Sequence, residues 1–211
     1  MTRVTVVDYG LGNLFSVARA FRAAGAEVEL TSDPGAVRSA ERLVLPGVGA
    51  FRDGMIGLRA RDLVGPVVEF VRSGRPLMGI CLGMQLLMTE GTEFGDTSGL
   101  GLVAGRVVTF GADGRPVTGK IPHVGWSKLA PAGRWAGSML DRIEPGSSVY
   151  FSHSYFPAPT DPAVVLATAS HAGIDFCSFI RRDNIQASQF HPDMSGAVGL
   201  AIIRTFVEQR G

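Results

Sequence analysis

A cysteine stands between two glycines in the segment GICLGMQLL, residues 79–87. Gly79 and Gly83 lie two residues before and two residues after Cys81, which is the spacing of a nucleophile elbow, a sharp strand-to-helix turn that presents a reactive side chain. The helix-forming residues that follow would place the sulfur at a helix N-terminus, which favours thiolate over thiol. A lone cysteine is more often a small core residue. The two glycines favour the nucleophile for Cys81, whereas Cys177 has no such setting and is expected in the core.

A thiol nucleophile also needs a base. The sequence offers His123, His153, His171 and His191. In QFHPD, His191 directly follows a strand-like run, so it is expected at a sheet edge, and the carboxylate of Asp193 would orient the imidazole and stabilise its protonated form. The alternative is a surface turn in which Ser195 caps the last helix. Together with the cysteine elbow, the motif favours a Cys–His–Asp constellation.

Two glycine-rich segments resemble nucleotide-binding loops but lack essential residues. In GRPVTGKI (114–121), Ile121 replaces the Ser or Thr that would bind magnesium, and Pro122 follows where a helix should begin. In GLGNLF (10–15), Phe15 replaces the third glycine of a dinucleotide fingerprint. No Cys/His spacing is typical of zinc. The sequence therefore predicts neither a cofactor nor a metal.

The composition excludes several classes of partner. The chain has 211 residues, 45% of them hydrophobic, so it can bury one sizeable core, and a single domain over 1–211 is expected. Lys plus Arg total 20 against 19 for Asp plus Glu, so no net charge attracts nucleic acid or a membrane surface. No stretch reaches the roughly 18 apolar residues of a membrane span. Two distant cysteines suit a reducing compartment, and we expect a cytoplasmic protein.

The elements that would position these residues alternate between strands and helices in the first half of the chain. Strands are predicted at 3–8, 26–30, 42–47 and 76–80. Helices are predicted from Leu14 to about Gly25 and from about Pro66 to Ser73. Continuous apolar strands separated by helices indicate a parallel sheet covered on both faces, with functional loops at the carboxyl ends of its strands.

From about residue 100 the pattern changes to closely spaced strands separated by turn residues. These strands are predicted at 106–110, 148–151, 163–170, 175–182 and 184–190. The apolar spacing after Ser195 predicts a final helix. The predicted fold class is α/β: a three-layer, flavodoxin-like sandwich whose central sheet is largely parallel, with a smaller antiparallel extension.

Three motifs, taken together and in order, resemble the class I (triad) glutamine amidotransferases. They are LPGVGAF (45–51), GICLGMQ (79–85) and QFHP (189–192). Four longer stretches, VDYGLGNL (7–14), KIPHVGWSKL (120–129), YFSHSYF (150–156) and RDNIQASQFHPDMSG (182–196), are similar to one branch of that family, the glutaminase subunits of imidazole glycerol phosphate synthase in histidine biosynthesis. The resemblance spans essentially the whole chain.

This resemblance implies a role for each matching residue. Cys81 would attack the side-chain amide of glutamine, and His191 would take the thiol proton and return it to the departing ammonia before the glutamyl thioester is hydrolysed. The main-chain N–H groups of Leu82 and Val48 would form the oxyanion hole. Substrate glutamine would contact Gly49, Gln85, Glu93, His153, Ser154 and Tyr155. Alternatively, Gln85 and Glu93 are ordinary helix-surface residues.

The sequence departs from the family pattern beside the base. Asp193 stands where the family has glutamate and is one methylene shorter, and Met194 replaces the usual lysine. The shorter carboxylate would orient the imidazole less well and reduce activity. A second departure lies in GWSKL, where an asparagine commonly follows the tryptophan.

A separate synthase subunit is expected because free ammonia would be protonated and lost to solvent. By resemblance this partner is a (β/α)₈-barrel cyclase that forms a heterodimer with the chain and receives the ammonia. The docking face would include Tyr9, Asn13, His123 and Trp126. Trp126 suits an interface anchor but would equally suit the core.

Two other functions stay open at this point. A paralogous glutaminase subunit would supply ammonia to a different synthase, and Asp193 and Met194 motivate that alternative. A stand-alone cysteine hydrolase, or a degenerate binding subunit, is the other, because Cys–His chemistry by itself specifies acyl transfer and not glutamine.

Overall fold

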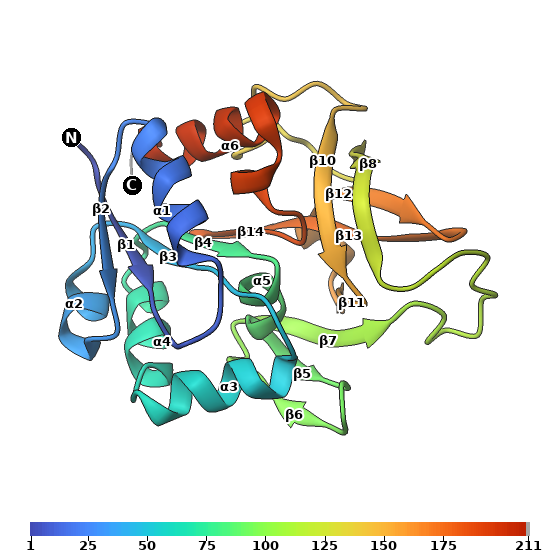
Figure 1. Cartoon of the computed structure of the whole chain (residues 1–211), viewed down its shortest axis with the longest axis horizontal. Helices are drawn as coiled ribbons and strands as arrows, with labels where there is room; N and C mark the ends of the chain where they lie inside the picture. Colours follow the sequence, from blue (N-terminus) through green and yellow to red (C-terminus); the bar gives the residue numbers. More distant parts are fainter. Residues whose placement is uncertain (210–211) are drawn as a thin grey trace.

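The computed structural model describes residues 1–209 and contains a main sheet of eight strands with helices on both faces (Figure 1). In spatial order the strands are β2 (Glu27–Thr31), β1 (Arg3–Val7), β3 (Leu43–Leu45), β4 (Leu77–Ile80), β14 (Ile185–Ser188), β13 (Ile174–Arg182), β12 (Val165–His171) and β9 (Ala130–Pro131). The first five strands are parallel, and the last three continue the sheet antiparallel. This arrangement confirms the predicted α/β class.

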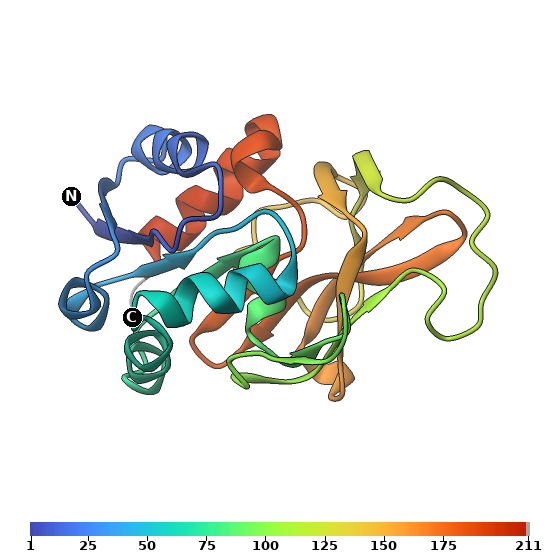
Figure 2. The same cartoon turned by 60° about the horizontal axis from the view of Figure 1, so that its bottom comes forward.

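The helices form two layers with the sheet between them, as Figure 2 shows. One layer contains α1 (Leu14–Ala23) and α6 (Gly196–Glu208), and the other contains α2 (Pro34–Ser39), α3 (Phe51–Ala60) and α4 (Val64–Arg72). The buried side chains divide into two clusters accordingly, because successive residues of a strand point to opposite faces. In β3, Val44 packs with the α1 and α6 layer, while Leu43 and Leu45 pack with the other.

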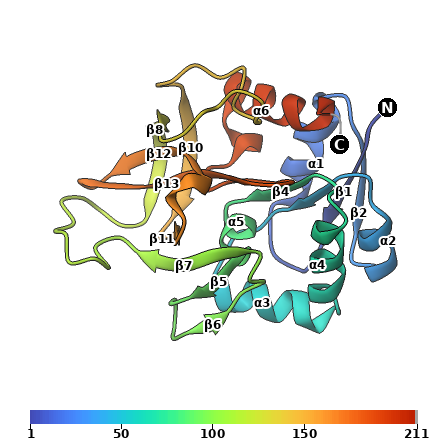
Figure 3. The same ribbon diagram turned by 180° about the vertical axis from the view of Figure 1, so that it is seen from behind.

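The second half of the chain builds a smaller extension beside these layers (Figure 3). A four-stranded sheet has the order β11 (Tyr155–Pro159), β7 (Val103–Thr109), β5 (Met88–Gly91) and β6 (Thr97–Ser98), and a separate antiparallel ribbon pairs β8 (His123–Lys128) with β10 (Ser148–His153). Short 3-10 turns, η1 (Pro162–Val164) and η2 (Pro192–Met194), precede β12 and α6. Within residues 1–209, none of the helices has the length and apolar character needed to cross a bilayer.

Every strand predicted from the sequence has a counterpart, but the short helix α2 was not predicted, and neither was helix α3. Gly54 and Gly57 lie in its middle and lower its helix propensity. A Cβ on Gly54 would come within 3.0 Å of Leu86, and one on Gly57 within 2.4 Å of the Tyr9 carbonyl oxygen. The two glycines therefore let α3 pack closely against its neighbours, and this tertiary requirement outweighs propensity.

Candidate active site

Cys81 lies on a strained turn between β4 and α5 (Leu82–Leu86). Its backbone has φ 51° and ψ −108°, a region that non-glycine residues rarely adopt. The main-chain N–H of Cys81 donates a hydrogen bond of 2.7 Å to the carbonyl oxygen of Ser188, which ties the turn to the end of β14. The local geometry is that of a nucleophile elbow.

The two flanking glycines are required by close packing. A Cβ on Gly83 would lie 1.7 Å from the carbonyl oxygen of Leu45, and one on Gly79 would lie 2.9 Å from the Cβ of Ala187. Any side chain at Gly83 would therefore push α5 away from β3. The glycine spacing thus reflects the approach of the elbow to both neighbouring strands.

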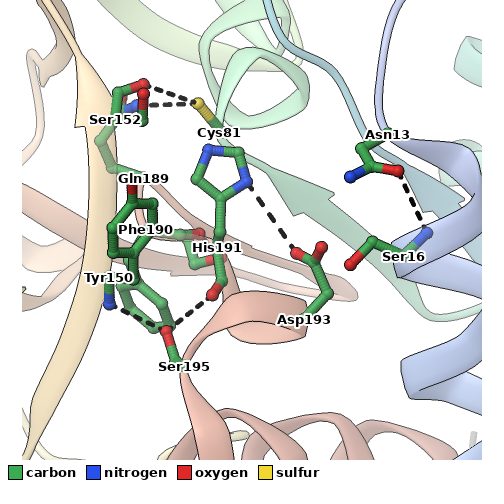
Figure 4. A network of polar contacts seen from close by, with 11 residues as sticks. Asn13, Ser16, Cys81, Tyr150, Ser152, Gln189, Phe190, His191, Asp193 and Ser195 are labelled. Carbon is green, nitrogen blue, oxygen red and sulfur yellow. Dashed lines mark hydrogen bonds and ion pairs between the residues drawn. The ribbon is translucent and has the colours of Figure 1, made fainter. Parts of the chain in front are cut away.

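Strand register brings His191 to the same rim of the sheet as Cys81. Ile80, the last residue of β4, pairs with Ser188, the last residue of β14, so the residues that follow the two strands meet beyond them. In Figure 4 the imidazole of His191 is drawn between the thiol of Cys81 and the carboxylate of Asp193. The three side chains thus follow one another in the order that a triad requires.

The carboxylate of Asp193 is close to the imidazole without being hydrogen-bonded to it. His191 Nδ1 and Asp193 Oδ1 are 3.9 Å apart, which is beyond hydrogen-bond distance. The Asp193 side chain is only 2% exposed, and its Oδ1 has no hydrogen-bond partner among the described residues. Asp193 therefore acts on His191 through its charge in this conformation.

Ser195 holds the backbone of His191 in place and does not cap the last helix through its side chain. Its hydroxyl donates a 2.6 Å hydrogen bond to the carbonyl oxygen of His191 and accepts one of 2.9 Å from the N–H of Tyr150 (Figure 4). The N–H of His191 in turn donates to the carbonyl oxygen of Tyr150 at 2.9 Å. The histidine is thus fixed between α6 and β10.

The thiol and the imidazole are both neutral near neutral pH. Burial raises the pKa of Cys81 to about 12, although N–H groups of Leu82 and Gln189 near the sulfur oppose the shift. The N–H of Leu82 at the start of α5 lowers the pKa of Cys81, as the sequence predicts for a helix N-terminus, but burial outweighs this effect and the predicted thiolate is not favoured in this conformation. Burial also lowers the pKa of His191, with partial opposition from Asp193. A neutral imidazole can accept the thiol proton.

A polar cavity surrounds the thiol, and all six residues predicted to contact glutamine line it. Its walls are formed by Gly49, Cys81, Leu82, Gln85, Glu93, Ser152, His153, Ser154 and Tyr155. Gln85 is buried, and Glu93 lies in the turn between β5 and β6, where its Oε2 accepts a 2.9 Å hydrogen bond from the N–H of Phe51. The alternative that Gln85 and Glu93 are ordinary helix-surface residues is therefore wrong.

The position predicted for the oxyanion hole is occupied by a carbonyl group. The N–H of Leu82 donates to the carbonyl oxygen of Gly47 at 3.3 Å. Because a trans peptide places its C=O and N–H on opposite sides, the N–H of Val48 points away from Leu82. In this conformation Val48 therefore does not supply the second donor that the sequence predicts, and the loop would have to turn this peptide over to do so.

Two of the four residues predicted for the docking face are buried. Tyr9 is 1% exposed, and its hydroxyl donates to the carbonyl oxygen of Pro46 at 2.6 Å. His123 is 3% exposed, and its ring stacks on His171 with centroids 4.0 Å apart. Neither side chain can line a docking face here, so both predictions are corrected. Asn13 is exposed at the start of α1, and Trp126 is 57% exposed, which excludes the core for Trp126.

Two residues of the site were not singled out from the sequence, Ser152 in the cavity wall and Gln189 beside the thiol. Gln189 is fully buried, and its side-chain amide lies against the sulfur of Cys81. The only signal for Gln189 in the sequence was a glutamine in the strand-like run NIQASQF, next to the histidine motif. Within residues 1–209, no group of three His, Cys, Asp or Glu side chains is arranged to hold a metal ion.

Comparison with known proteins identifies similar sequences of the same length. Residues 5–209 match the family described as "Glutamine amidotransferase class-I". The chain is 47% identical to "Imidazole glycerol phosphate synthase subunit HisH 1" of Legionella pneumophila (strain Lens), over 99% of this chain and 100% of that protein. It is 45% identical to "Imidazole glycerol phosphate synthase subunit HisH" of Geobacter sulfurreducens, over 100% of both chains.

Solved structures with much lower identity share the fold. "Structure of PurLQS from Thermotoga maritima" superposes with a TM-score of 0.74 at 18% identity, and "Crystal structure of glutamine amidotransferase" with 0.70 at 20% identity, each over 97% of both chains. At these identities the likeness concerns the arrangement of the chain alone.

Proposed function

Because the chain belongs to the class I glutamine amidotransferases, we propose that it hydrolyses glutamine at Cys81 and delivers the ammonia to the cyclase subunit of an imidazole glycerol phosphate synthase. The observation that carries this proposal is the cavity in which the six residues expected to contact glutamine surround the thiol. The full-length similarity to two HisH subunits supports the choice of synthase. Such a biosynthetic role is expected in the cytoplasm.

The chemistry follows from the neutral Cys81–His191 pair. His191 takes the proton of the thiol as the sulfur attacks the side-chain carbonyl carbon of glutamine, so a C–S bond forms and an oxyanion develops. The C–N bond then breaks, and the imidazolium returns the proton to the departing ammonia. Water, deprotonated by the same imidazole, attacks the thioester carbonyl and releases glutamate and the thiol. Asp193 would stabilise the imidazolium in both halves of the reaction.

The blocked oxyanion hole supports a requirement for a partner. With the Gly47 carbonyl on the N–H of Leu82, one oxyanion donor is occupied and the other is turned away. Removal of a single such donor typically costs about 10²- to 10³-fold in kcat. Gly49, which has a φ of +113° that favours glycine, gives the loop the freedom to reorient the 47–48 peptide. We propose that docking of the cyclase drives this reorientation.

An exposed apolar surface near the active site supports the location of the docking face. Its members are Phe15, Val48, Val124, Trp126 and Met194, each more than 40% exposed. A second cavity, lined among others by Asn13, Val48, His191 and Met194, lies beside this surface. A partner bound here would cover the route by which ammonia leaves His191, so the docking face is now proposed from these residues together with Asn13.

An assay of glutamine hydrolysis with and without the cyclase and its nucleotide substrate tests the proposal. Weak hydrolysis by the chain alone and strong stimulation by the partner are expected, and Cys81→Ser should abolish both. The Cys177→Ser variant is the matched control, because Cys177 is also a buried thiol but does not line the cavity, and it should retain stimulation. Stimulated hydrolysis by Cys81→Ser would overturn the proposal.

A second candidate function is favoured by the residues beside the base. The separation of 3.9 Å between Asp193 and His191, and an exposed Met194 where the family has lysine, fit a paralogous subunit that feeds ammonia to another synthase. The histidine-pathway subunit and the paralogue can be distinguished by testing whether the chain rescues a histidine auxotroph that lacks its own glutaminase subunit. Failure of rescue by a chain that hydrolyses glutamine would favour the paralogue. Full turnover of other amides without any partner would instead favour a stand-alone hydrolase.

A further inference from the structure

Two buried glutamine side chains link the wall of the cavity to the sulfur of Cys81. Gln85 Nε2 donates to the carbonyl oxygen of Tyr155 at 2.9 Å and to Oε1 of Gln189 at 3.1 Å. Gln189 Nε2 then points to Cys81 Sγ at 3.6 Å, an N–H···S contact that Figure 4 shows. Gln85 is 4% exposed and Gln189 is 0% exposed, so water does not compete for these groups.

The direction of this chain of hydrogen bonds is fixed by a main-chain group. The carbonyl oxygen of Tyr155 can only accept, so the Gln85 amide must present its nitrogen to it. The same nitrogen also faces Gln189, which must therefore present its oxygen to Gln85. The NH₂ group of Gln189 is then directed to the sulfur. Reversal of either amide would place two acceptors, or two donors, against each other in a buried site.

Two other groups near the sulfur disfavour a negative charge, whereas the main-chain N–H of Leu82 favours one. The thiol of Cys81 lies 3.9 Å from the carbonyl oxygen of Ser152, which can accept the S–H proton but would repel a thiolate. The carboxylate of Asp193 raises the pKa of Cys81, and the side-chain hydrogen bond from Gln189 lowers it. Gln189 therefore supplies a side-chain donor where the reaction generates the anion.

We propose that Gln189 is a further catalytic residue, whose N–H holds the sulfur and stabilises the thiolate as the proton passes to His191. This inference rests on the proposed role of Cys81 as the nucleophile. Since Gln85 and Tyr155 also line the cavity, the amide that contacts the sulfur is oriented by the walls of the glutamine site itself. Gln189 thus connects the substrate cavity to the activation of the nucleophile.

A purely structural role is the competing explanation, and Gln186 offers a matched control for it. Gln186 lies on β14, is 7% exposed and makes two internal hydrogen bonds, from Met139 N–H at 2.7 Å and to Gln209 Oε1 at 3.0 Å. Neither bond reaches Cys81. Replacement of Gln186 by methionine removes a buried amide of the same size from the same strand region without changing the surroundings of the sulfur.

The test is the rate at which iodoacetamide alkylates Cys81 in the full chain, measured by mass spectrometry over a range of pH without glutamine. Gln189→Met is expected to slow alkylation at a given pH by about tenfold, because loss of the donor raises the pKa of the thiol by about one unit. Gln189→Glu, which keeps the shape of the side chain, is expected to slow it further by placing a carboxylate beside the sulfur. Gln186→Met should retain the wild-type pH profile.

Folding of each variant is checked by its melting temperature and circular dichroism. If Gln189→Met does not fold, the isosteric Gln189→Glu carries the test. A folded Gln189 variant that is alkylated with the wild-type rate and pH profile overturns the inference. Failure of the proposed function would show differently, as glutamine hydrolysis that survives Cys81→Ser, because alkylation is measured without any turnover.

Discussion

Asp193 is a buried carboxylate with one unsatisfied oxygen, 3.9 Å from the ring that it faces. Burial of an acceptor without a hydrogen-bond partner costs free energy, and a positive charge on the His191 ring would offset that cost. Its distance from His191 follows from the short aspartate side chain on the η2 turn. A small change in the length of this side chain therefore changes directly how its carboxylate can interact with the His191 ring.

We expect Asp193→Glu to raise the partner-stimulated kcat about threefold, because the extra methylene brings a carboxylate oxygen within hydrogen-bond distance of Nδ1. Asp193→Asn is expected to lower kcat by roughly 10²-fold, because the imidazolium loses its counter-charge. The matched control is Asp183→Asn, at an exposed turn before β14. Steady-state glutaminase assays measure all three. Wild-type activity in Asp193→Asn would exclude a role for this carboxylate.

At this scale the sequence predicted which residues gather but not how they are hydrogen-bonded. The cavity contains Cys81 and all six expected contacts because motifs at strand ends converge at one rim. The burial of Tyr9 and His123 depends on loops and on the β8–β10 ribbon, whose packing leaves no periodic signal in the chain. Gln189 was missed for a similar reason, since only the folded site shows that its amide faces sulfur.

The elbow element depends on how closely α5 approaches β3. Gly83→Ala is expected to lower the free energy of unfolding by about 3 kcal/mol or more, because the new methyl would lie 1.7 Å from the Leu45 carbonyl oxygen and must force the elements apart. Gly65→Ala, also near the start of a helix, meets nothing closer than 3.8 Å and should change the free energy of unfolding by less than about 1 kcal/mol, because Pro66 after it offsets the better helix propensity of alanine. Urea denaturation compares the two. Equal stabilities would contradict the packing argument.

Strands β8, β10 and β12 bring three histidine rings together beside the cavity. His123 lies between His171 and Phe151, with ring centroids 4.0 and 4.8 Å away. Burial, reinforced by His171, lowers the pKa of His123 to about 4, and burial lowers that of His153 to about 3. As pH falls below 6.5 the unfolded chain binds protons that the folded chain excludes, so stability is lost from pH 6.5 down to the folded pKa values.

Between pH 7 and pH 4.5 the free energy of unfolding of the His123→Phe variant is therefore expected to fall by about 2 kcal/mol less than that of the wild type. The reason is that the phenyl ring has no proton to bind. Ser127→Ala is the control. It removes the 3.0 Å hydrogen bond to His123 Nε2 but keeps the titrating ring, so it should keep most of the acid sensitivity. Urea denaturation at the two pH values measures the difference. An identical pH dependence in His123→Phe and the wild type would contradict the assignment.

Among the elements, the regular part of the fold was predictable and the irregular part was not. Buried strands such as β1 and β4 are apolar runs bounded by turns, and their parallel order follows from the helices between them. Helix α3 was hidden by its glycines, which serve contacts with Leu86 and Tyr9. Strand β8 alternates regularly in exposure, but its less exposed positions are His123, Gly125 and Ser127, so the sequence shows no apolar alternation there.

On the scale of the whole molecule, the proposed docking face is connected to His191, the proposed base, by main-chain hydrogen bonds. Trp126 on β8 lies opposite Tyr150 on β10, with ring centroids 6.0 Å apart. The N–H and C=O of Tyr150 are bonded to Ser195 and His191 respectively. A partner that contacts Trp126 would therefore act on the strand that holds His191, and one that contacts Val48 would act on the loop proposed to form the oxyanion hole.

Trp126→Ala is accordingly expected to weaken binding of the cyclase about 30-fold, because a large exposed ring at the centre of an interface is typically worth about 2 kcal/mol. The chain alone should keep its basal hydrolysis and melting temperature, since the ring is 57% exposed. Leu30→Ala, at the exposed β2 edge of the main sheet, removes apolar surface away from this face and should bind normally. Calorimetric titration of the cyclase into each variant measures the affinity. Equal affinities for Trp126→Ala and Leu30→Ala would show that Trp126 is not part of the docking face. The hydrogen bonds that connect β10 to His191 would then have no part in activation by the partner.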